Sequence, residues 1–188
     1  MLQLLKSLVQ PHLDYCSQLW SPSAQQLINK IEGVQKSLIN RIQDRELVHC
    51  DYWQKLKNLR LYSQERRRER YQIIFIWKIS QGMISGYNIP FSRNSRTGRW
   101  AVPAYLSGRG VSSNVRHAKE SSLRVKGCQL FNILPAVLRN ADHGDLPMFK
   151  NNLDHFLSNI PDQPTIPGLQ RAAETNSLIH QAALVEGW

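Results

Sequence analysis

The sequence lacks the features that identify several common classes of protein. It has 3 cysteines in 188 residues, and Cys16, Cys50 and Cys128 stand far apart with no C-x-x-C pair. This spacing indicates neither a disulfide framework nor a zinc finger. The longest apolar run, Ile73 to Trp77, is far shorter than the roughly 20 residues that a membrane-spanning helix needs. We therefore expect an intracellular protein, nuclear and cytoplasmic, with no membrane partner.

Motifs that carry catalysis are also missing from the sequence. It contains no GxxxxGK[ST] phosphate loop, no HExxH zinc motif and no GxSxG nucleophile elbow. Asp142 and Asp145 form a close acid pair, but Gly144 and Pro147 beside them favour a turn with a helix-capping aspartate over a metal site. The sequence predicts no active site, no metal site and no cofactor within these residues.

Acidic residues are scarce, with 14 Asp and Glu against 24 Lys and Arg, and the excess charge is uneven. Residues 41–90 contain ten basic and five acidic side chains, residues 91–127 contain eight and one, and residues 128–188 contain three and six. The positive charge is thus concentrated between Arg41 and Lys126. Such asymmetry favours a polyanionic partner, most often phosphate, although an acidic membrane surface or solubility alone would also account for it.

The densest basic cluster begins a predicted helix from Leu61 to Gln81, which no Pro or Gly interrupts. Its first half carries four arginines, Arg66, Arg67, Arg68 and Arg70. Its second half is apolar all round and must be buried. We expect the arginine end near the surface, paired in part with Glu65 and Glu69, because guanidinium groups without matching carboxylates are costly to bury. From this segment alone a solvated helix end is the simpler explanation, and a phosphate contact needs further support.

The sequence divides into three predicted regions. Residues 1–81 are predicted to form a helical, thumb-like region. Residues 82–127 are basic and rich in Gly and Pro, and short apolar groups such as Leu123 to Val125 predict loops with short strands or a hairpin. Residues 128–188 are predicted to be helical again, with a Pro-rich connector over residues 160–168. The predicted fold is mainly α with a small irregular or β-hairpin insert.

Three patterns specify individual helices. One helix is predicted to begin at Ser21-Pro22 and to bury an apolar stripe: Leu27, Ile31, Val34, Leu38 and Ile42, joined by Ile28 and Ile39. Another, opened by Pro147, is predicted to bury Phe149, Leu153, Phe156, Leu157 and Ile160. Pro135 is predicted to divide the segment from Cys128 to Arg139 into two short helices, or to begin the second of them.

Several segments carry a family resemblance when they are taken in order along the chain. They are PHLDYCSQLW (11–20), IEGVQK (31–36), YWQKL (52–56), LYS (61–63), ERRRERY (65–71), LFNILP (130–135), FK (149–150), LD (153–154) and IPD (160–162). Together they resemble the region that follows the polymerase palm in reverse transcriptases of non-LTR retrotransposons of the LINE type, similar to jockey and CR1. The resemblance covers most of the chain in one order, which makes it more specific than any single segment.

The resemblance implies that the chain is the thumb and C-terminal tail of an RNA-directed DNA polymerase. In that family the palm carries the metal-binding aspartates, so Mg²⁺ is expected only in a palm that this chain does not contain. A thumb holds the template–primer duplex by its sugar-phosphate backbone, which needs Arg and Lys but no base readout. The implied partners are RNA, an RNA–DNA hybrid duplex and the missing palm domain.

The candidate nucleic-acid-binding residues are Arg66, Arg67, Arg68, Arg70 and Lys78 of the long helix, with Arg96, Arg99, Arg109 and Arg124 of the basic region. Trp100 and Tyr105 are weaker candidates for base stacking, because core packing is the commoner role of such residues. Two alternatives stay open. The chain could be a protein-interaction module that docks helices through the faces Leu27 to Ile42 and Phe149 to Ile160, or a retrotransposon relic without a selected function.

Overall fold

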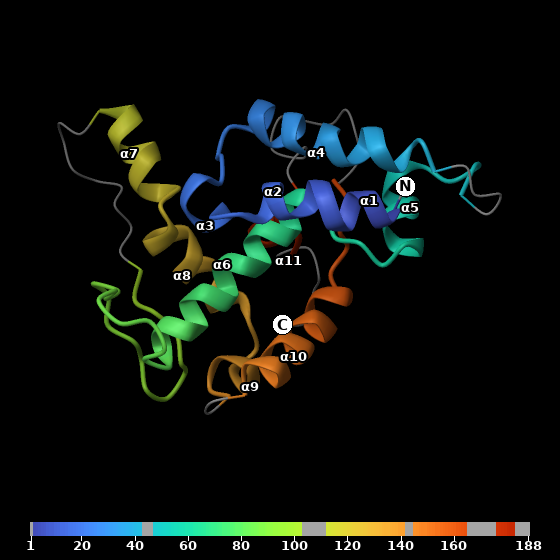
Figure 1. Cartoon of the computed structure of the whole chain (residues 1–188). Coiled ribbons are helices and arrows are strands. Elements are labelled where there is room, and N and C mark those ends of the chain that lie inside the picture. Colours follow the sequence, from blue (N-terminus) through green and yellow to red (C-terminus); the bar gives the residue numbers. More distant parts are fainter. Residues whose placement is uncertain (1, 43–46, 103–111, 142–144, 165–175, 183–188) are drawn as a thin grey trace. The chain divides into compact units, whose positions relative to one another are not determined.

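A computed structural model describes residues 2–42, 47–102, 112–141, 145–164 and 176–182, and these residues are mainly α-helical (Figure 1). The chain forms two compact units. Unit 1 combines Met1–Arg68 with Asp162–His180, and unit 2 combines Glu69–Pro161 with Gln181–Trp188. The predicted mainly-α fold class is confirmed. None of the helices in the described ranges is both long and apolar enough to cross a bilayer.

Unit 1 begins with a helical segment in which α1, a π-helical stretch η1 and α2 follow one another without a break. Its helices are α1 (Leu2–Leu4), η1 (Leu5–Val9), α2 (Gln10–Asp14), α3 (Ser17–Trp20), α4 (Gln25–Ile39) and α5 (Tyr52–Asn58). The core of the unit includes Leu5, Ile39, Tyr52 and Leu56, so α4 packs on both the N-terminal segment and α5 (Figure 1).

The predicted buried face of α4 is wrong in part. Leu27 and Val34 are 49% and 43% exposed, whereas Ile28, Gln35 and Ile39 are buried. A glutamine can take the central buried position because its Nε2 donates to Tyr52 Oη (3.2 Å) and to the Tyr62 carbonyl (3.0 Å). The apolar pattern alone could not reveal this polar core position, since it counts only hydrophobic residues.

The predicted start of this helix at Ser21-Pro22 is also wrong. The helix α4 begins at Gln25 after Ala24, and no side chain caps it. Ser21 instead ends α3, and its hydroxyl accepts a hydrogen bond from Arg68 Nε (3.1 Å). The serine is thus engaged by a distant arginine and is not available as a cap.

The long helix α6 (Gln64–Ser80) confirms the helix predicted over residues 61–81 and contributes to both units. Further along the chain are α7 (Ser113–Glu120), a second π-helical stretch η2 (Leu123–Gly127), α8 (Cys128–Ile133), α9 (Ala136–Arg139), α10 (Leu146–Ser158) and α11 (Leu178–Ala182). The break between α8 and α9 at Pro135 is as predicted.

The core of unit 2 forms around the apolar half of α6. Trp77 is 1% exposed and stacks on Phe149 of α10, with ring centroids 4.5 Å apart. Gly127 approaches Ile76 so closely that an added Cβ would lie 2.9 Å from Ile76 Cγ1. The predicted buried face of α10 is confirmed, from Phe149 to Ile160, and Asp145 caps the helix by accepting from the Met148 amide (3.1 Å). Asp142 lies outside the described residues.

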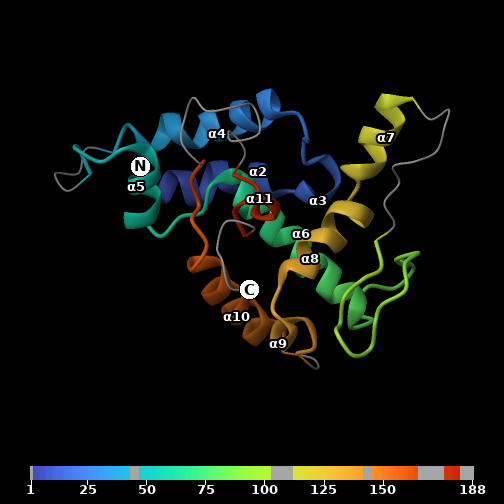
Figure 2. The same cartoon turned by 180° about the vertical axis from the view of Figure 1, so that it is seen from behind.

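The prediction of short strands between residues 82 and 127 is largely wrong. Among the described residues of this region, extended pairing is limited to one antiparallel bridge between Arg93 and Trp100, and Figure 2 shows residues 82–102, in green, as irregular. Leu123 and Val125 lie in η2 instead. There the amides of Val125 and Lys126 bond locally to the Ser122 carbonyl (3.0 and 2.8 Å) and need no partner strand.

Candidate nucleic-acid interface

The arginines at the start of α6 are largely withdrawn from solvent, which corrects the prediction of a surface cluster. Arg66 is 0% exposed and Arg68 is 2% exposed. Arg67 and Arg70 keep 27% and 16% of their side-chain area exposed. A duplex backbone could not reach the first two without a rearrangement of the fold.

Carboxylates from distant segments explain this burial. Arg67 forms a bidentate ion pair with Asp14 of α2, with distances of 2.7 to 3.0 Å. Arg70 pairs in the same way with Asp154 of α10 (2.5 and 2.7 Å). Arg66 Nε lies 3.9 Å from Asp162. These contacts assign the cluster a structural role, since bidentate pairs with low exposure hold helices together.

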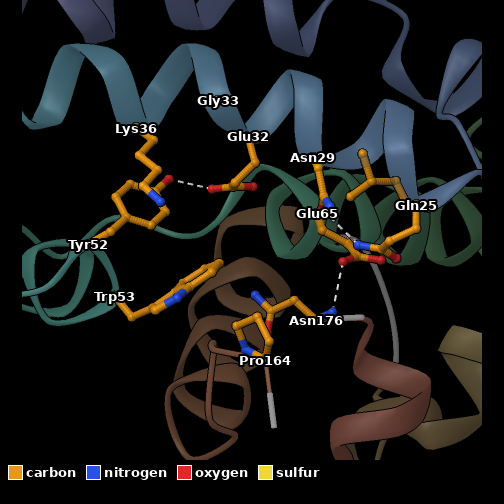
Figure 3. Close-up of a pocket in the computed structure, with 11 residues that line it drawn as sticks. Gln25, Asn29, Glu32, Gly33, Lys36, Tyr52, Trp53, Glu65, Pro164 and Asn176 are labelled. Atoms are coloured by element: carbon orange, nitrogen blue, oxygen red, sulfur yellow. Dashed lines mark hydrogen bonds between the residues drawn. The ribbon is translucent and has the colours of Figure 1, made fainter. Parts of the chain in front are cut away.

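A polar cavity of about 270 Å³ lies in unit 1 between α4, α5 and the start of α6 (Figure 3). Glu32 faces Tyr52, and its Oε1 accepts a hydrogen bond from the Tyr52 hydroxyl. The other carboxylate oxygen of Glu32, Oε2, accepts from the backbone amide of Gln64 (2.8 Å). Burial raises the pKa of Glu32, although these two hydrogen bonds oppose the shift. Glu65 accepts from the Asn176 amide (3.0 Å). Two carboxylates in its lining make the cavity unsuited to phosphate.

The arginine turn, residues 93–100 of unit 2, contains two of the predicted binding residues, Arg96 and Arg99. Asn94 organises it: its amide donates to the Arg99 carbonyl (2.8 Å), and its Oδ1 accepts from the amides of Arg96 and Thr97 (both 2.9 Å). Gly98 closes the turn with φ +67°. The side chains of Arg96 and Arg99 are exposed on this fixed backbone.

Side chains from two neighbouring helices anchor the arginine turn. Asn132 of α8 bonds the amide and the carbonyl of Trp100, both at 2.8 Å. Arg139 of α9 donates from Nε to the Thr97 carbonyl (2.8 Å), and Arg93 donates to the carbonyls of Gly98 (3.2 Å) and Arg139 (2.6 Å). Side chains of α8 and α9 therefore both bond to the main chain of the turn and fix it in place.

Four arginines thus gather at this turn, and no carboxylate of the described residues pairs with them. Within the described part of the chain, none of Arg93, Arg96, Arg99 and Arg139 forms an ion pair. Burial lowers the pKa of Arg139, and the charges of Arg99 and Arg93 lower it further. Burial also lowers the pKa of Arg93. The turn therefore combines fixed geometry with uncompensated positive charge, as an anion site requires.

The remaining predicted residues are dispersed. Lys78 is half-buried in the last turn of α6, and Arg124 of η2 is exposed with its guanidinium 5.5 Å from the centre of the Tyr87 ring. Arg109 and Tyr105 lie outside the described residues. Trp100 is half-buried beneath Arg93, 6.0 Å from its ring centre, which favours packing over base stacking.

The prediction from sequence missed Arg93 and Arg139. Arg139 lies in the region where acidic residues outnumber basic ones, so charge counting passed over it. A local signal could have found Arg93: the stretch Asn94 to Gly98 has the asparagine and glycine of a tight turn, with an arginine on either side. No local signal points to Arg139, which reaches the Thr97 carbonyl across 42 residues.

Comparisons with protein-family models, with curated proteins and with solved structures found no match to this chain.

Proposed function

We propose that the chain is a thumb-like and C-terminal region of a non-LTR retrotransposon reverse transcriptase, and that it binds the sugar-phosphate backbone of RNA and of RNA–DNA hybrids. The role is non-catalytic: it holds the template–primer duplex for a palm supplied by the rest of the polymerase. Sequence resemblance and the distribution of charge are the grounds for this proposal.

The observation that carries the proposal is the uncompensated charge of the arginine turn. Exposed arginines on a fixed backbone, with no carboxylate paired to them in the described residues, favour a polyanion over a neutral partner. Lys78 and Arg124 add positive charge elsewhere in unit 2.

The proposed interface is narrower than the sequence suggested. Arg66, Arg67, Arg68 and Arg70 leave it, because they are buried or paired with Asp14, Asp154 and Asp162. Lys78, Arg96, Arg99 and Arg124 remain, and Arg109 stays a candidate that lies outside the described residues.

The test is binding of the chain to a fluorescently labelled RNA–DNA hybrid, measured by anisotropy over a range of salt concentrations. We expect log affinity to fall linearly with log salt, with a slope of about −0.9 for each phosphate contacted. A folded protein that does not bind the hybrid, or binds it independently of salt, would contradict the proposal.

A second function, docking of a protein partner, has support from unit 1. Leu4, Leu8 and Leu19 are 49%, 62% and 80% exposed, and Leu27 of α4 is exposed as well. Exposed apolar groups of this kind favour a contact with another protein, such as the missing palm. The face from Phe149 to Ile160 drops out of this alternative, because its apolar residues are buried within unit 2.

This alternative has its own measurement. Sedimentation of the chain alone should reveal concentration-dependent association that the double variant Leu8→Gln/Leu19→Gln removes, with hybrid binding unchanged. A monomeric chain at all concentrations would leave the exposed leucines without a demonstrated partner and would count against the docking function.

A further inference from the structure

The main chain of the arginine turn is held more rigidly than non-specific binding of a polyanion requires. A solvated basic surface needs only flexible side chains, whereas the main chain of this turn is fixed at Asn94, Gly98 and Trp100 by internal and helical hydrogen bonds. We propose that the turn is a preformed site for a single phosphate group, bound by the guanidinium groups of Arg96 and Arg99. The inference rests on the proposed function, of which it specifies the point of closest contact.

The chemistry of the two exposed residues selects the ligand class. Guanidinium groups present planar pairs of N–H donors that match the oxygens of phosphate, and they bind it more specifically than lysine does. Arg96 and Arg99 are three residues apart, on either side of Gly98 and Thr97. The amides of Arg96 and Thr97 are occupied by Asn94 Oδ1, so the side chains must make the contact.

Arg93 and Arg139 act as positioning residues in this site. Their guanidinium groups donate to main-chain carbonyls of Thr97, Gly98 and Arg139, which fixes the backbone but leaves their charges uncancelled. Carbonyl dipoles stabilise a cation only partly, so a bound dianion would relieve the remaining repulsion among the four arginines. The backbone is ordered before binding, which reduces the entropy lost when the anion is bound.

Gly98 offers a way to disturb this geometry without changing any charge. It has φ +67°, and an added Cβ would collide with Asn140 Oδ1 and lie 3.1 Å from Arg139 Cβ. Gly82 and Gly86 provide matched controls, because they have φ +70° and +74° but an added Cβ would meet nothing within 4 Å. Alanine at any of the three positions brings similar backbone strain, and only Gly98→Ala also forces the turn or its neighbours Asn140 and Arg139 to move.

The experiment compares the wild-type chain, Gly98→Ala, Gly82→Ala and Arg96→Ala/Arg99→Ala in binding the labelled RNA–DNA hybrid. We expect Gly98→Ala to lose about tenfold in affinity, as one charge-assisted contact would, while Gly82→Ala stays at the wild-type value. Equal affinity of Gly98→Ala and Gly82→Ala would overturn the inference and leave the proposed function intact, since distributed charge would then suffice.

A second measurement separates the two proposals and covers a Gly98→Ala chain that fails to fold. Inorganic phosphate is titrated into the wild-type chain while the arginine Nε–Hε resonances are followed by NMR. Saturable shifts of Arg96 and Arg99, absent with chloride at equal ionic strength, support the site. If they occur in a chain that does not bind the hybrid, the site takes free phosphate and only the proposed function fails. Unsaturable or absent shifts overturn the site.

Discussion

Asp162 holds Ser63 at the start of α6: one carboxylate oxygen accepts from the Ser63 amide (2.7 Å) and the other from its hydroxyl (2.8 Å). Asn176 joins this contact by donating from Nδ2 to Asp162 Oδ1 (2.5 Å) and to Ser63 Oγ (2.9 Å). The first turn of α6 is thereby attached to two points of the C-terminal part of unit 1. The carboxylate also faces the positive end of the helix, where negative charge is stabilising.

Removing this carboxylate should destabilise unit 1. We expect Asp162→Ala to lower the free energy of unfolding by about 2 kcal/mol, because the amide and hydroxyl of Ser63 lose their acceptor and the buried Arg66 loses its nearby carboxylate. Asp51→Ala, which removes the exposed cap of α5, is the control and should lose about 1 kcal/mol. Urea denaturation measures both. Equal losses would show that Asp162 contributes no more than an exposed helix cap does.

The arginines of α6 should affect stability and not binding. We expect Arg70→Ala to lower the free energy of unfolding by about 1 kcal/mol, since its bidentate pair with the partly exposed Asp154 is lost. The salt dependence of hybrid binding should keep its wild-type slope. A slope reduced by about 0.9 would instead place Arg70 on a phosphate.

Removing charge at the arginine turn should weaken hybrid binding and leave stability unchanged. We expect Arg96→Ala/Arg99→Ala to reduce the magnitude of the salt slope by up to about 1.8, with little change in the urea midpoint because both side chains are exposed. The control Lys30→Ala/Lys57→Ala removes the same charge from exposed positions in unit 1. If the control variant reduced the salt slope of hybrid binding by the same amount, binding would depend on net charge alone.

The polar centre of α4 should tolerate change less than its apolar surface. Gln35→Leu should cost about 2 kcal/mol, because the Tyr62 carbonyl loses a buried hydrogen-bond donor. Leu27→Gln should change stability by no more than about 0.5 kcal/mol, since Leu27 is 49% exposed. Thermal and urea unfolding of the two variants provide the comparison, and the reverse order of stabilities would refute the observed orientation of the helix.

Glu32 should make the stability of the chain depend on pH. Burial raises its pKa above the ordinary value of 4.5, so the folded state binds this proton more tightly than the unfolded state does. Its contribution is therefore fully present below the ordinary pKa and is lost as pH rises through the raised one. We expect wild-type stability, relative to Glu32→Gln, to fall as pH rises above the ordinary pKa of 4.5. A relative stability that rises with pH would indicate a lowered pKa.

The sequence predicted the helices better than the faces they bury. Pro135, Pro147 and the apolar run from Ile73 to Trp77 are local signals, and the structure follows them at α8, α9, α10 and α6. The orientation of α4 was predicted less well, because Gln35 is buried by hydrogen bonds to Tyr52 and Tyr62, which no periodic pattern of apolar residues encodes.

The burial of the α6 arginines could not be predicted from local sequence. Their carboxylate partners lie 53 residues away for Arg67 and 84 residues away for Arg70, whereas Glu65 and Glu69 are the acidic residues that the helix itself offers. For the arginine turn, the sequence predicted Arg96 and Arg99 as binding residues in a basic region rich in Gly and Pro, but the anchoring by Arg139 depends on tertiary contact.

The contact between Asp162 and Ser63 has a consequence for synthesis of the chain. Ser63 and Asp162 are 99 residues apart in sequence, so a ribosome translates the whole first stretch of α6 long before it reaches the carboxylate that holds Ser63. The helix start can therefore take its final form only after the C-terminal segment has been translated.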